Sequence, residues 1–383
     1  MKKKYFITGF MIILGILVLL RLSINDNKDL AVYIENELNS SIPANNENLY
    51  VNKIDCDNNV NAYWDNDNWG LFISNLSKKT KCNLYFIYDT QKPYWQIEEV
   101  ERTSVLSTDI FTIKISGNDS LSKVTSSLDT SSLSFYVNDT LQSPIKVELT
   151  KLEELNKKIT YSIKVHMVGG EGNLKLKINS NTLTDNETNQ NDEITLDTGI
   201  TVSKNPAKIL HYYAFKNKDY SLSIEPLLNY YSNINSLHEI TINDVINDNY
   251  DLVFIDYYAW EVPTIANDIF NNNIKLVTCG NDSTDGLDII KSYFRGSKLE
   301  SSTKVIDNKL TYYMPNIIGG DGDGETLINF NENVTTIFKN NSNGNNYDTM
   351  GYLIQNNNIW FHSQNMYINK YIIQIIQFTL GQL

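Results

Sequence analysis

One uncharged apolar run near the N-terminus constrains this chain more than any other feature of its sequence. Residues 5–20 read YFITGFMIILGILVLL, with three lysines before them and Arg21 after them. At ~1.5 Å rise per residue, a helix of this length covers most of a bilayer core, and the flanking Lys and Arg stems reach the interfaces. The run predicts a transmembrane helix within residues 1–24, and the lysines place the N-terminus in the cytoplasm and the rest of the chain outside.

A cleaved signal peptide is the alternative interpretation of this run. Its cleavage site would require small residues around positions 20–23, and the sequence LRLSIN offers no such pair. The sequence favours an uncleaved signal anchor, and hence a single-pass protein of the cell membrane with an extracellular C-terminal ectodomain. Residues 25–48 are polar and predict a stalk between the anchor and the first folded unit.

The charge of the chain narrows the classes of partner. The net charge is −13 at pH 7, and residues 1–21 hold four positive charges and no acid. Nucleic acid and anionic lipid reward Lys and Arg on a protein, so the acidic remainder argues against both as partners. Local groups of carboxylates could instead hold divalent cations such as calcium, and the sequence indicates no other cofactor.

Residues 49–96 predict a small β module with a disulfide. Cys56 and Cys82 stand at the ends of predicted strands, and an isolated cysteine pair in an exported domain usually forms a disulfide. The pattern C…WDNDNW…ISNL…KCN resembles a small module found near the anchors of Firmicutes cell-surface proteins. Trp64 and Trp69 are interpreted either as core or as an exposed platform for a sugar, and the burial energy of large aromatic side chains favours the core.

Residues 97–205 predict a β-sandwich. Short segments with alternating apolar and polar residues follow one another, with turn signals between them. In residues 159–167 this alternation places Ile159 and Ile163 on the buried face and His166 on the solvated face. The closing segment GGEGNLKLKINSNTLTDNETNQNDEITLDTGITV resembles the last strands of bacterial Ig-like domains of surface proteins, which serve as spacers or adhesive modules.

The loop TLTDNETNQND inside this segment carries a candidate calcium site. Asp185, Asn189, Asn191 and Asp192 could present oxygen ligands to Ca²⁺. Their spacing lacks the order of an EF-hand and its closing bidentate glutamate, so a polar turn is the favoured interpretation.

Residues 206–383 predict an α/β domain with a mainly parallel sheet, because near-continuous apolar strands alternate with amphipathic helices there. The segments YDLVFID, KLVTCGND and GYLIQNNNIWFHSQN resemble the class I glutamine amidotransferase-like superfamily, in the degenerate version appended to bacterial surface proteins. The resemblance implies a flavodoxin-like fold. The predicted fold class is thus a multidomain chain with an N-terminal transmembrane helix, two all-β domains and one flavodoxin-like domain.

Ligands of open α/β sheets bind beyond the carboxyl ends of the strands. The candidate ligand-binding residues at these ends are Asp256, Tyr257, Trp260, Asn281 and Asp282. We expect a ligand or partner, such as a glycan or a surface protein, to bind there.

The resemblance also implies a catalytic pair. In active members of the superfamily, a cysteine at a strand–helix elbow attacks an amide, and a later His-x-Glu supplies the base and its orienting carboxylate. Cys279 and His362 occupy the corresponding places. However, Gln364 stands where the glutamate belongs, and the elbow lacks the second glycine of the family. These departures favour a non-catalytic domain.

The segment GGDGDGE, residues 319–325, is a second candidate for calcium. Asp321, Asp323 and Glu325 alternate with glycines that let the backbone curl, so their carboxylates could converge on one cation. Gly-Asp loops are also common flexible turns, and this interpretation stays open.

Two hypotheses about function result from these features. The favoured one is a non-catalytic, membrane-anchored bacterial surface protein that binds a ligand or partner through its outer domains, in adhesion or glycan recognition. The alternative is a surface amidase or related hydrolase that depends on Cys279 and His362. An accessible thiolate at Cys279 would favour the hydrolase, and an inert buried thiol would favour the binding protein.

Overall fold

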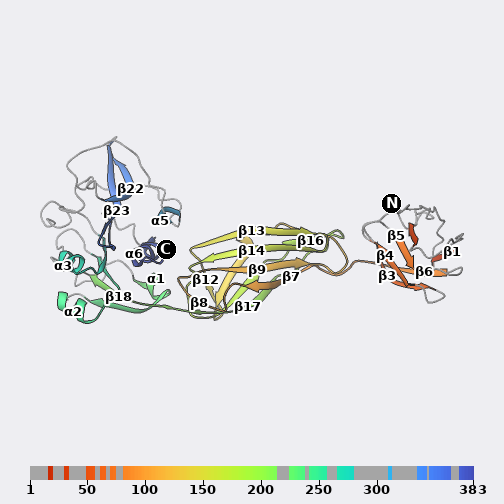
Figure 1. Cartoon of the computed structure of the whole chain (residues 1–383), viewed down its shortest axis with the longest axis horizontal. Coiled ribbons are helices and arrows are strands. Elements are labelled where there is room, and N and C mark those ends of the chain that lie inside the picture. The colour runs from red at the N-terminus through yellow and green to blue at the C-terminus, as the bar shows by residue number, and fades with distance from the viewer. Residues whose placement is uncertain are drawn as a thin grey trace.

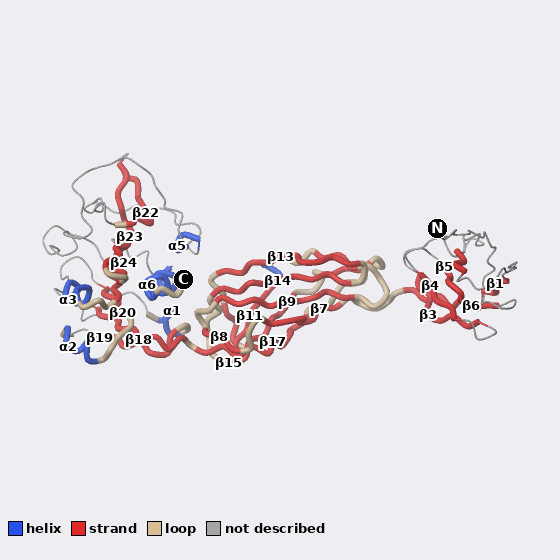
Figure 2. Tube along the Cα trace, in the orientation of Figure 1, coloured by secondary structure: helices blue, strands red, loops and turns tan. Residues whose placement is uncertain are grey.

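The chain folds into three units, which Figure 1 shows in a row. The computed structural model describes residues 16–19, 30–33, 49–56, 61–65, 70–74, 81–213, 224–237, 241–256, 265–279, 309–312, 334–342, 345–363 and 371–383. A small β module contains strands β1 to β6, a β-sandwich follows from β7 to β17, and an α/β unit begins at β18. The sandwich lies between the other two units, with its strands running along the long axis of the molecule (Figure 2).

The small module contains two three-stranded antiparallel sheets. One has the order β1-β6-β3 and the other β2-β5-β4. Their bounds are β1 (Ile16–Leu19), β2 (Leu30–Tyr33), β3 (Leu49–Cys56), β4 (Asn61–Asp65), β5 (Gly70–Ser74) and β6 (Lys81–Tyr88). The module therefore includes strands on both sides of residue 25, where the sequence predicted a boundary between an anchor and a stalk.

The predicted transmembrane helix is wrong. Ile16–Leu19, near the C-terminal end of the apolar run, form β1 and pair antiparallel with β6, with Ile16 opposite Leu84. An apolar run can satisfy its backbone by pairing with a neighbouring strand, and β-branched residues such as Ile16 and Val18 favour this extended form. None of the helices among the described residues combines the length and apolar character that a membrane crossing needs. The predicted single-pass location in the cell membrane depended on that helix and is corrected with it.

The predicted disulfide has a compatible backbone register. Cys56 in β3 is the register partner of Cys82 in β6. Cα atoms of directly opposed antiparallel residues lie about 4.5–5.5 Å apart, which falls inside the range that disulfides span. The disulfide itself stays a prediction.

The sandwich consists of a five-stranded sheet, β12-β11-β15-β17-β8, and a four-stranded sheet, β13-β14-β9-β7, with a two-stranded ribbon, β10-β16, at one end. All pairs are antiparallel except β17 with β8. The bounds are β7 (Tyr94–Val100), β8 (Ser104–Leu106), β9 (Ile110–Asn118), β10 (Val124–Ser126), β11 (Leu133–Val137), β12 (Thr140–Gln142), β13 (Lys146–Leu155), β14 (Lys158–His166), β15 (Gly172–Ile178), β16 (Leu183–Asp185) and β17 (Ile194–Ser203).

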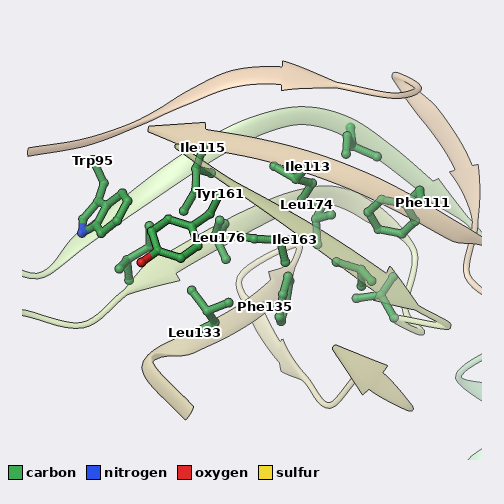
Figure 3. Packing of buried hydrophobic residues seen from close by; sticks show 14 of the residues in the cluster. Trp95, Phe111, Ile113, Ile115, Leu133, Phe135, Tyr161, Ile163, Leu174 and Leu176 are labelled. Carbon is green, nitrogen blue, oxygen red and sulfur yellow. The ribbon is translucent and has the colours of Figure 1, made fainter. Parts of the chain in front are cut away.

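The two inner faces of the sandwich form one hydrophobic core (Figure 3). Ile159 and Ile163 of β14 are fully buried in it, as the alternation of β14 predicts. Trp95 and Tyr161 lie together near one end of this core, and the indole Nε1 of Trp95 donates a hydrogen bond to Thr182 Oγ1 at 3.0 Å. This bond ties β7 to the loop that precedes β16, and so fixes the end of the sandwich nearest the small module.

The α/β unit has one seven-stranded sheet in the order β19-β18-β20-β21-β24-β23-β22. The first five strands in this order are parallel, and β23 and β22 add antiparallel to β24. Taken in chain order, the parallel strands stand as 2-1-3-4-5, which is the flavodoxin-like arrangement. The bounds are β18 (Asn205–Tyr213), β19 (Tyr231–Leu237), β20 (Leu252–Asp256), β21 (Lys275–Cys279), β22 (Thr335–Ser342), β23 (Asn345–Gln355) and β24 (Asn358–Ser363).

Helices cover both faces of this sheet. Helices α2 (Ile242–Asn247) and α3 (Ile265–Asn271) pack on one face. Helices α1 (Glu225–Leu228), α5 (Lys309–Tyr312) and α6 (Ile372–Leu380) pack on the other. The α6 helix is buried on nearly all sides, because it packs against the sheet and shares a hydrophobic cluster with residues of the sandwich. Both faces of the sheet are therefore closed to solvent at its centre.

The sandwich and the α/β unit share a continuous interface. Met167, which follows β14, belongs to the same hydrophobic cluster as α6 and the sheet beneath it. Ser107 Oγ donates to the carbonyl oxygen of Tyr230 at 2.6 Å, and Gly170 N donates to the carbonyl oxygen of Asn229 at 2.8 Å. Only Lys204 separates the end of β17 from the start of β18. The two units are thus joined both along the chain and across a packed surface.

The prediction that His166 is solvated is wrong. Its side chain is completely buried, since Tyr312 of α5 covers this face of the sandwich and its ring centroid lies 6.5 Å from that of His166. His166 Nε2 lies 3.3 Å from Glu148 Oε1 on β13. Burial lowers the pKa of His166 below its ordinary 6.5 by more than the Glu148 carboxylate raises it. The alternation of β14 correctly separates two faces, but a neighbouring unit covers the second one.

Candidate functional site

The predicted catalytic residues lie on neighbouring strands with an offset of one residue. Cys279 ends β21 and His362 lies in β24, but Cys279 is in register with Ser363, and His362 with Thr278. His362 Nδ1 lies 2.9 Å from Thr278 Oγ1, so these two side chains share one face of the sheet. Successive side chains of a strand point to opposite faces, which places Cys279 on the other one.

The packing of the two faces agrees with this assignment. Cys279 belongs to the cluster with Val277 and Phe361 under α6, whereas Trp360 lies in the cluster under α3 and donates from Nε1 to Thr278 Oγ1 at 2.9 Å. Burial lowers the pKa of His362 to about 3, so its imidazole is neutral at pH 7. The structure does not bring Cys279 and His362 together as a nucleophile and its base.

The other sequence-predicted residues of the α/β unit are largely outside the described residues. Asp256 ends β20 in register with Cys279, at the carboxyl edge of the sheet as expected. The four remaining candidates for ligand binding, Tyr257, Trp260, Asn281 and Asp282, are not described. Neither are Gln364 and the predicted calcium ligands of the GGDGDGE loop, Asp321, Asp323 and Glu325. Trp69 of the small module also lies outside the described residues. These predictions stay as they were made.

A cluster of three buried carboxylates lies at the end of the sandwich nearest the small module. Asp89, Asp119 and Asp185 each offer one oxygen, and these oxygens all lie within 4.8 Å of one another. We call these three residues the carboxylate cluster. Their exposed fractions are 3%, 7% and 5%, so the carboxylates are nearly cut off from bulk water. Three acidic side chains held this close require either protons or a cation to offset their repulsion.

Each member of the cluster follows or ends a strand. Asp89 comes directly after β6, Asp119 comes directly after β9, and Asp185 is the last residue of β16. Asp119 Oδ1 accepts from the backbone N–H groups of Leu121 and Ser122, at 2.7 and 2.8 Å, which is the side-chain-to-backbone pattern of an Asx turn. The local sequence thus turns the chain at the strand end through Oδ1 and leaves the other oxygen, Oδ2, out of the hydrogen bonds of the turn.

The hydrogen bonds of the cluster leave one oxygen of Asp119 available. Asp89 accepts from Gln91 N at 2.9 Å and from the Ser122 hydroxyl, and Asp185 accepts from Asn189 N at 2.8 Å and Asn189 Nδ2 at 2.9 Å. In contrast, the buried Oδ2 of Asp119 has no hydrogen-bond partner among the described residues. A buried carboxylate oxygen without a donor is costly, so this atom indicates a ligand.

Glu187 adds a fourth acid near the cluster. Its Oε1 is buried and also has no hydrogen-bond partner within the described part of the chain. Burial first, and then the charges of Asp185 and Asp89, raise the pKa of Glu187. Burial is also the largest cause that raises the pKa of Asp119, followed by the charges of Asp89 and Asp185. Both shifts reflect carboxylates that gather in one poorly solvated place.

The predicted calcium loop contributes only part of this site. Asp185 and Asn189 lie in it, as the sequence indicated. Asn191 has a structural role, because its Oδ1 accepts from the backbone N–H groups of Thr182 and Leu183. Asp192 is exposed and pairs with Lys92 at 2.6 Å. The turn therefore exists as predicted, but the carboxylate cluster uses one end of it together with two distant strand ends.

Asp89 and Asp119 were missed by reasoning from the sequence. Both stand immediately after a predicted strand, Asp89 in the segment FIYDTQ and Asp119 in ISGNDS. The available signal was a set of aspartates at the ends of several strands, which a sandwich can bring to one end. The topology decides which strands finish at the same end of the sandwich, and the topology could not be derived from the sequence alone.

Comparisons with known proteins add little. No family model matches the chain, and no curated protein matches it. A solved structure, the crystal structure of Dpr2 Ig1-Ig2 in complex with DIP-Theta Ig1-Ig3, aligns with 34% of this chain and 39% of that chain. The identity is 14% and the TM-score is 0.18, which is too low to support an argument about fold or function.

Proposed function

We propose that this chain is a non-catalytic modular protein that binds a divalent cation, with Ca²⁺ as the ion that fits best, at the carboxylate cluster. One observation carries the proposal. The Oδ2 atom of Asp119 is buried and has no hydrogen-bond donor among the described residues, and Asp119 offers a carboxylate oxygen within 4.8 Å of oxygens of Asp89 and Asp185. An ion at this point supplies the missing partner and offsets the repulsion between the three acids.

The donor set selects the class of ion. Every candidate ligand is an oxygen, from Asp89, Asp119, Asp185 and Glu187, and hard cations prefer oxygen, whereas zinc and copper sites use His and Cys. Ca²⁺ accepts six to eight oxygens in irregular geometry, whereas Mg²⁺ demands a near-ideal octahedron. A site assembled from two strand-end aspartates and one turn offers irregular geometry, which favours Ca²⁺.

The non-catalytic part of the proposal is supported by the α/β unit. A hydrolase of the class I glutamine amidotransferase-like type needs its thiol next to its imidazole, and here Cys279 and His362 face opposite sides of the sheet. The strand order 2-1-3-4-5 fits the flavodoxin-like fold of that superfamily, so only the placement of the two side chains speaks against catalysis. Cys-dependent hydrolysis is therefore the less favoured alternative.

Isothermal titration of the purified full-length chain with CaCl₂, after removal of metals by a chelator, tests the proposal. We expect Asp119→Asn to lower the calcium affinity at least ~10-fold, since a lost charged ligand costs about 1.4 kcal/mol or more. Asp192→Asn is the matched control, because Asp192 belongs to the same loop but its exposed carboxylate pairs with Lys92.

A second control separates the two predicted calcium sites. The double variant Asp321→Asn/Asp323→Asn removes the carboxylates of the GGDGDGE loop and should leave the Asp119-dependent binding unchanged. Equal calcium affinity of the wild type and Asp119→Asn would overturn the proposal, and so would the absence of calcium binding in the wild type.

A further inference from the structure

The connection between the small module and the sandwich passes through the carboxylate cluster. Strand β6 of the module ends at Tyr88, and strand β7 of the sandwich begins at Tyr94. Residues 89–93 form the link, which Figure 1 shows between the two units. Asp89 is therefore both the first residue of the link and a member of the cluster. Its two partners, Asp119 and Asp185, belong to the sandwich.

Contacts from the sandwich hold the start of this link. Asn189 Nδ2 donates to the carbonyl oxygen of Asp89 at 3.1 Å, and the Ser122 hydroxyl donates to its carboxylate. Asp89 and Pro93 at the two ends of the link are buried, while the residues between them are exposed. The link thus enters the sandwich at Asp89, and the direction in which β6 leaves depends on how firmly Asp89 is held.

The contacts made by the exposed residues of the link are weak. Ser120 Oγ donates to Gln91 Oε1 at 2.6 Å on the surface, and Lys92 pairs with Asp192. The side chains of that ion pair are 55% and 78% exposed, so water and salt screen their attraction and the pair holds the link only weakly. In addition, the negative charges of Asp119 and Asp185 repel Asp89 in the absence of a cation. A shared cation would reverse the sign of this interaction.

We infer that cation binding locks the joint between the small module and the sandwich, an inference that rests on the proposed function of the cluster. The ion takes one ligand from the link, Asp89, and two from the sandwich, Asp119 and Asp185. With the ion, Asp89 is drawn to the sandwich and β6 leaves in one direction. Without it, mutual repulsion loosens Asp89 and the module samples many directions. Calcium affinity and module orientation are then coupled, so each must influence the other.

Distance measurements between spin labels on the two units test the inference. Exposed positions Asn61 on β4 and Glu153 on β13 become cysteines in a Cys279→Ala background of the full-length chain. We expect a narrow distance distribution in CaCl₂ and a broad one in EDTA. Asp89→Asn keeps the size of the side chain but removes its charge, and should abolish the narrowing. Lys92→Gln removes only the exposed ion pair with Asp192, and the distance distribution of this variant should still narrow in CaCl₂.

Calorimetric calcium binding, measured on the same labelled samples, separates the two ideas. Suppose that calcium binds, that Asp119→Asn weakens this binding, and that the distance distribution is the same in CaCl₂ and in EDTA. The locked joint is then overturned and the cation site stands. If calcium does not bind, the proposed function fails and the inference falls with it. Narrowing that persists in Asp89→Asn would also overturn the inference, because the ion would then act through another residue.

Discussion

His362 lies in register with Thr278 rather than with Cys279, and this offset of one residue puts the two predicted catalytic side chains on opposite faces of the sheet. The hydrogen bond between His362 Nδ1 and Thr278 Oγ1 fixes the imidazole on the side of α3. The thiol of Cys279 packs beneath α6. Because the side-chain period of a strand is two, a shift of a single residue decides whether such a pair can react.

The first prediction concerns the reactivity of the Cys279 thiol. Its side chain is buried, so alkylation by iodoacetamide should be slow in the native protein and fast after denaturation. The rate should follow the global or local opening of the α/β unit, with no acid-shifted component between pH 6 and 8. Mass spectrometry of the modified peptide separates Cys279 from the other two cysteines. A fast native reaction with an apparent pKa well below ~8.5 would contradict this picture.

The second prediction follows from the buried His362. Burial lowers its pKa to about 3 in the folded state, against 6.5 in the unfolded state, so the unfolded state binds the proton more tightly. The contribution of the neutral His362 to the free energy of unfolding is therefore fully present above pH 6.5. It is lost as the pH falls toward 3, by up to ~1.4 kcal/mol per pH unit. Hydrogen exchange of β21 and β24, corrected for intrinsic rates, should show this acid loss. His362→Gln should reduce the slope, and an unchanged slope would contradict the assignment.

The third prediction combines pH and calcium. The pKa of Asp119 is raised above its ordinary 3.8, so the folded state binds this proton more tightly than the unfolded state. In EDTA, the contribution of Asp119 to the free energy of unfolding should fall as the pH rises from about 4 through the raised pKa, opposite in sign to the contribution of His362. Calcium binds the ionised carboxylates, so the gain in Tm on adding CaCl₂ should be largest near pH 7 and vanish toward pH 4. A gain that is equal at pH 4 and pH 7 would argue against a carboxylate site.

The fourth prediction uses the close packing behind the cluster. A Cβ atom on Gly117 would lie 2.7 Å from Leu183 Cδ1 and 3.0 Å from Trp95 Cζ3. Leu183 is fully buried and belongs to β16, the strand that ends with Asp185. Gly117→Ala should therefore destabilise the sandwich by ~1–3 kcal/mol and weaken calcium binding by displacing Asp185. Chemical denaturation and calorimetry measure the two effects, with exposed Thr150→Ala as the control. Destabilisation with unchanged calcium affinity would show that β16 does not position the cluster.

The fifth prediction tests the interface between the sandwich and the α/β unit. Asn205 is buried there, and its Nδ2 donates to Thr108 Oγ1 at 2.8 Å and to Gln382 Oε1 at 3.0 Å. Asn205→Ala leaves these partners without their donor, at an expected cost of ~1–3 kcal/mol. Scanning calorimetry should show the sandwich and the α/β unit unfolding together in the wild type and separating in the variant. Two separate transitions in the wild type would contradict the shared interface.

The sequence predicted correctly which face of a strand is apolar. It did not predict what covers the opposite face. The alternation of β14 located Ile159 and Ile163 in the core, whereas His166, on the opposite face, is buried by α5 of another unit. An alternating pattern reports the chemistry of the strand itself, and contacts from residues far along the chain leave no trace in it. The prediction of a helix from the apolar run near the N-terminus was wrong for a related reason. The hydrophobicity of the run is compatible with a strand that pairs with β6 as well as with a helix.

The candidate site was partly accessible from the sequence. The turn with Asp185 and Asn189 could be recognised as a source of oxygen ligands. Asp89 and Asp119 could not, since their proximity to Asp185 depends on three strand ends meeting at one end of the sandwich. In the same way, the order of Cys279 and His362 along the chain fits a catalytic pair, but the face of each side chain depends on how β21 and β24 align.

The passage from β17 to β18 through Lys204 has a mechanical consequence. The two strands belong to different sheets, and a single residue between them leaves almost no slack. Tension applied to the ends of the chain would pass from one sheet into the other without first extending a linker, and it would load the hydrogen bonds of β17 with β15 and of β18 with its neighbours together. Of the two described passages between units, residues 89–93 would then be the one that can extend, and a bound ion would resist this by holding Asp89 to the sandwich.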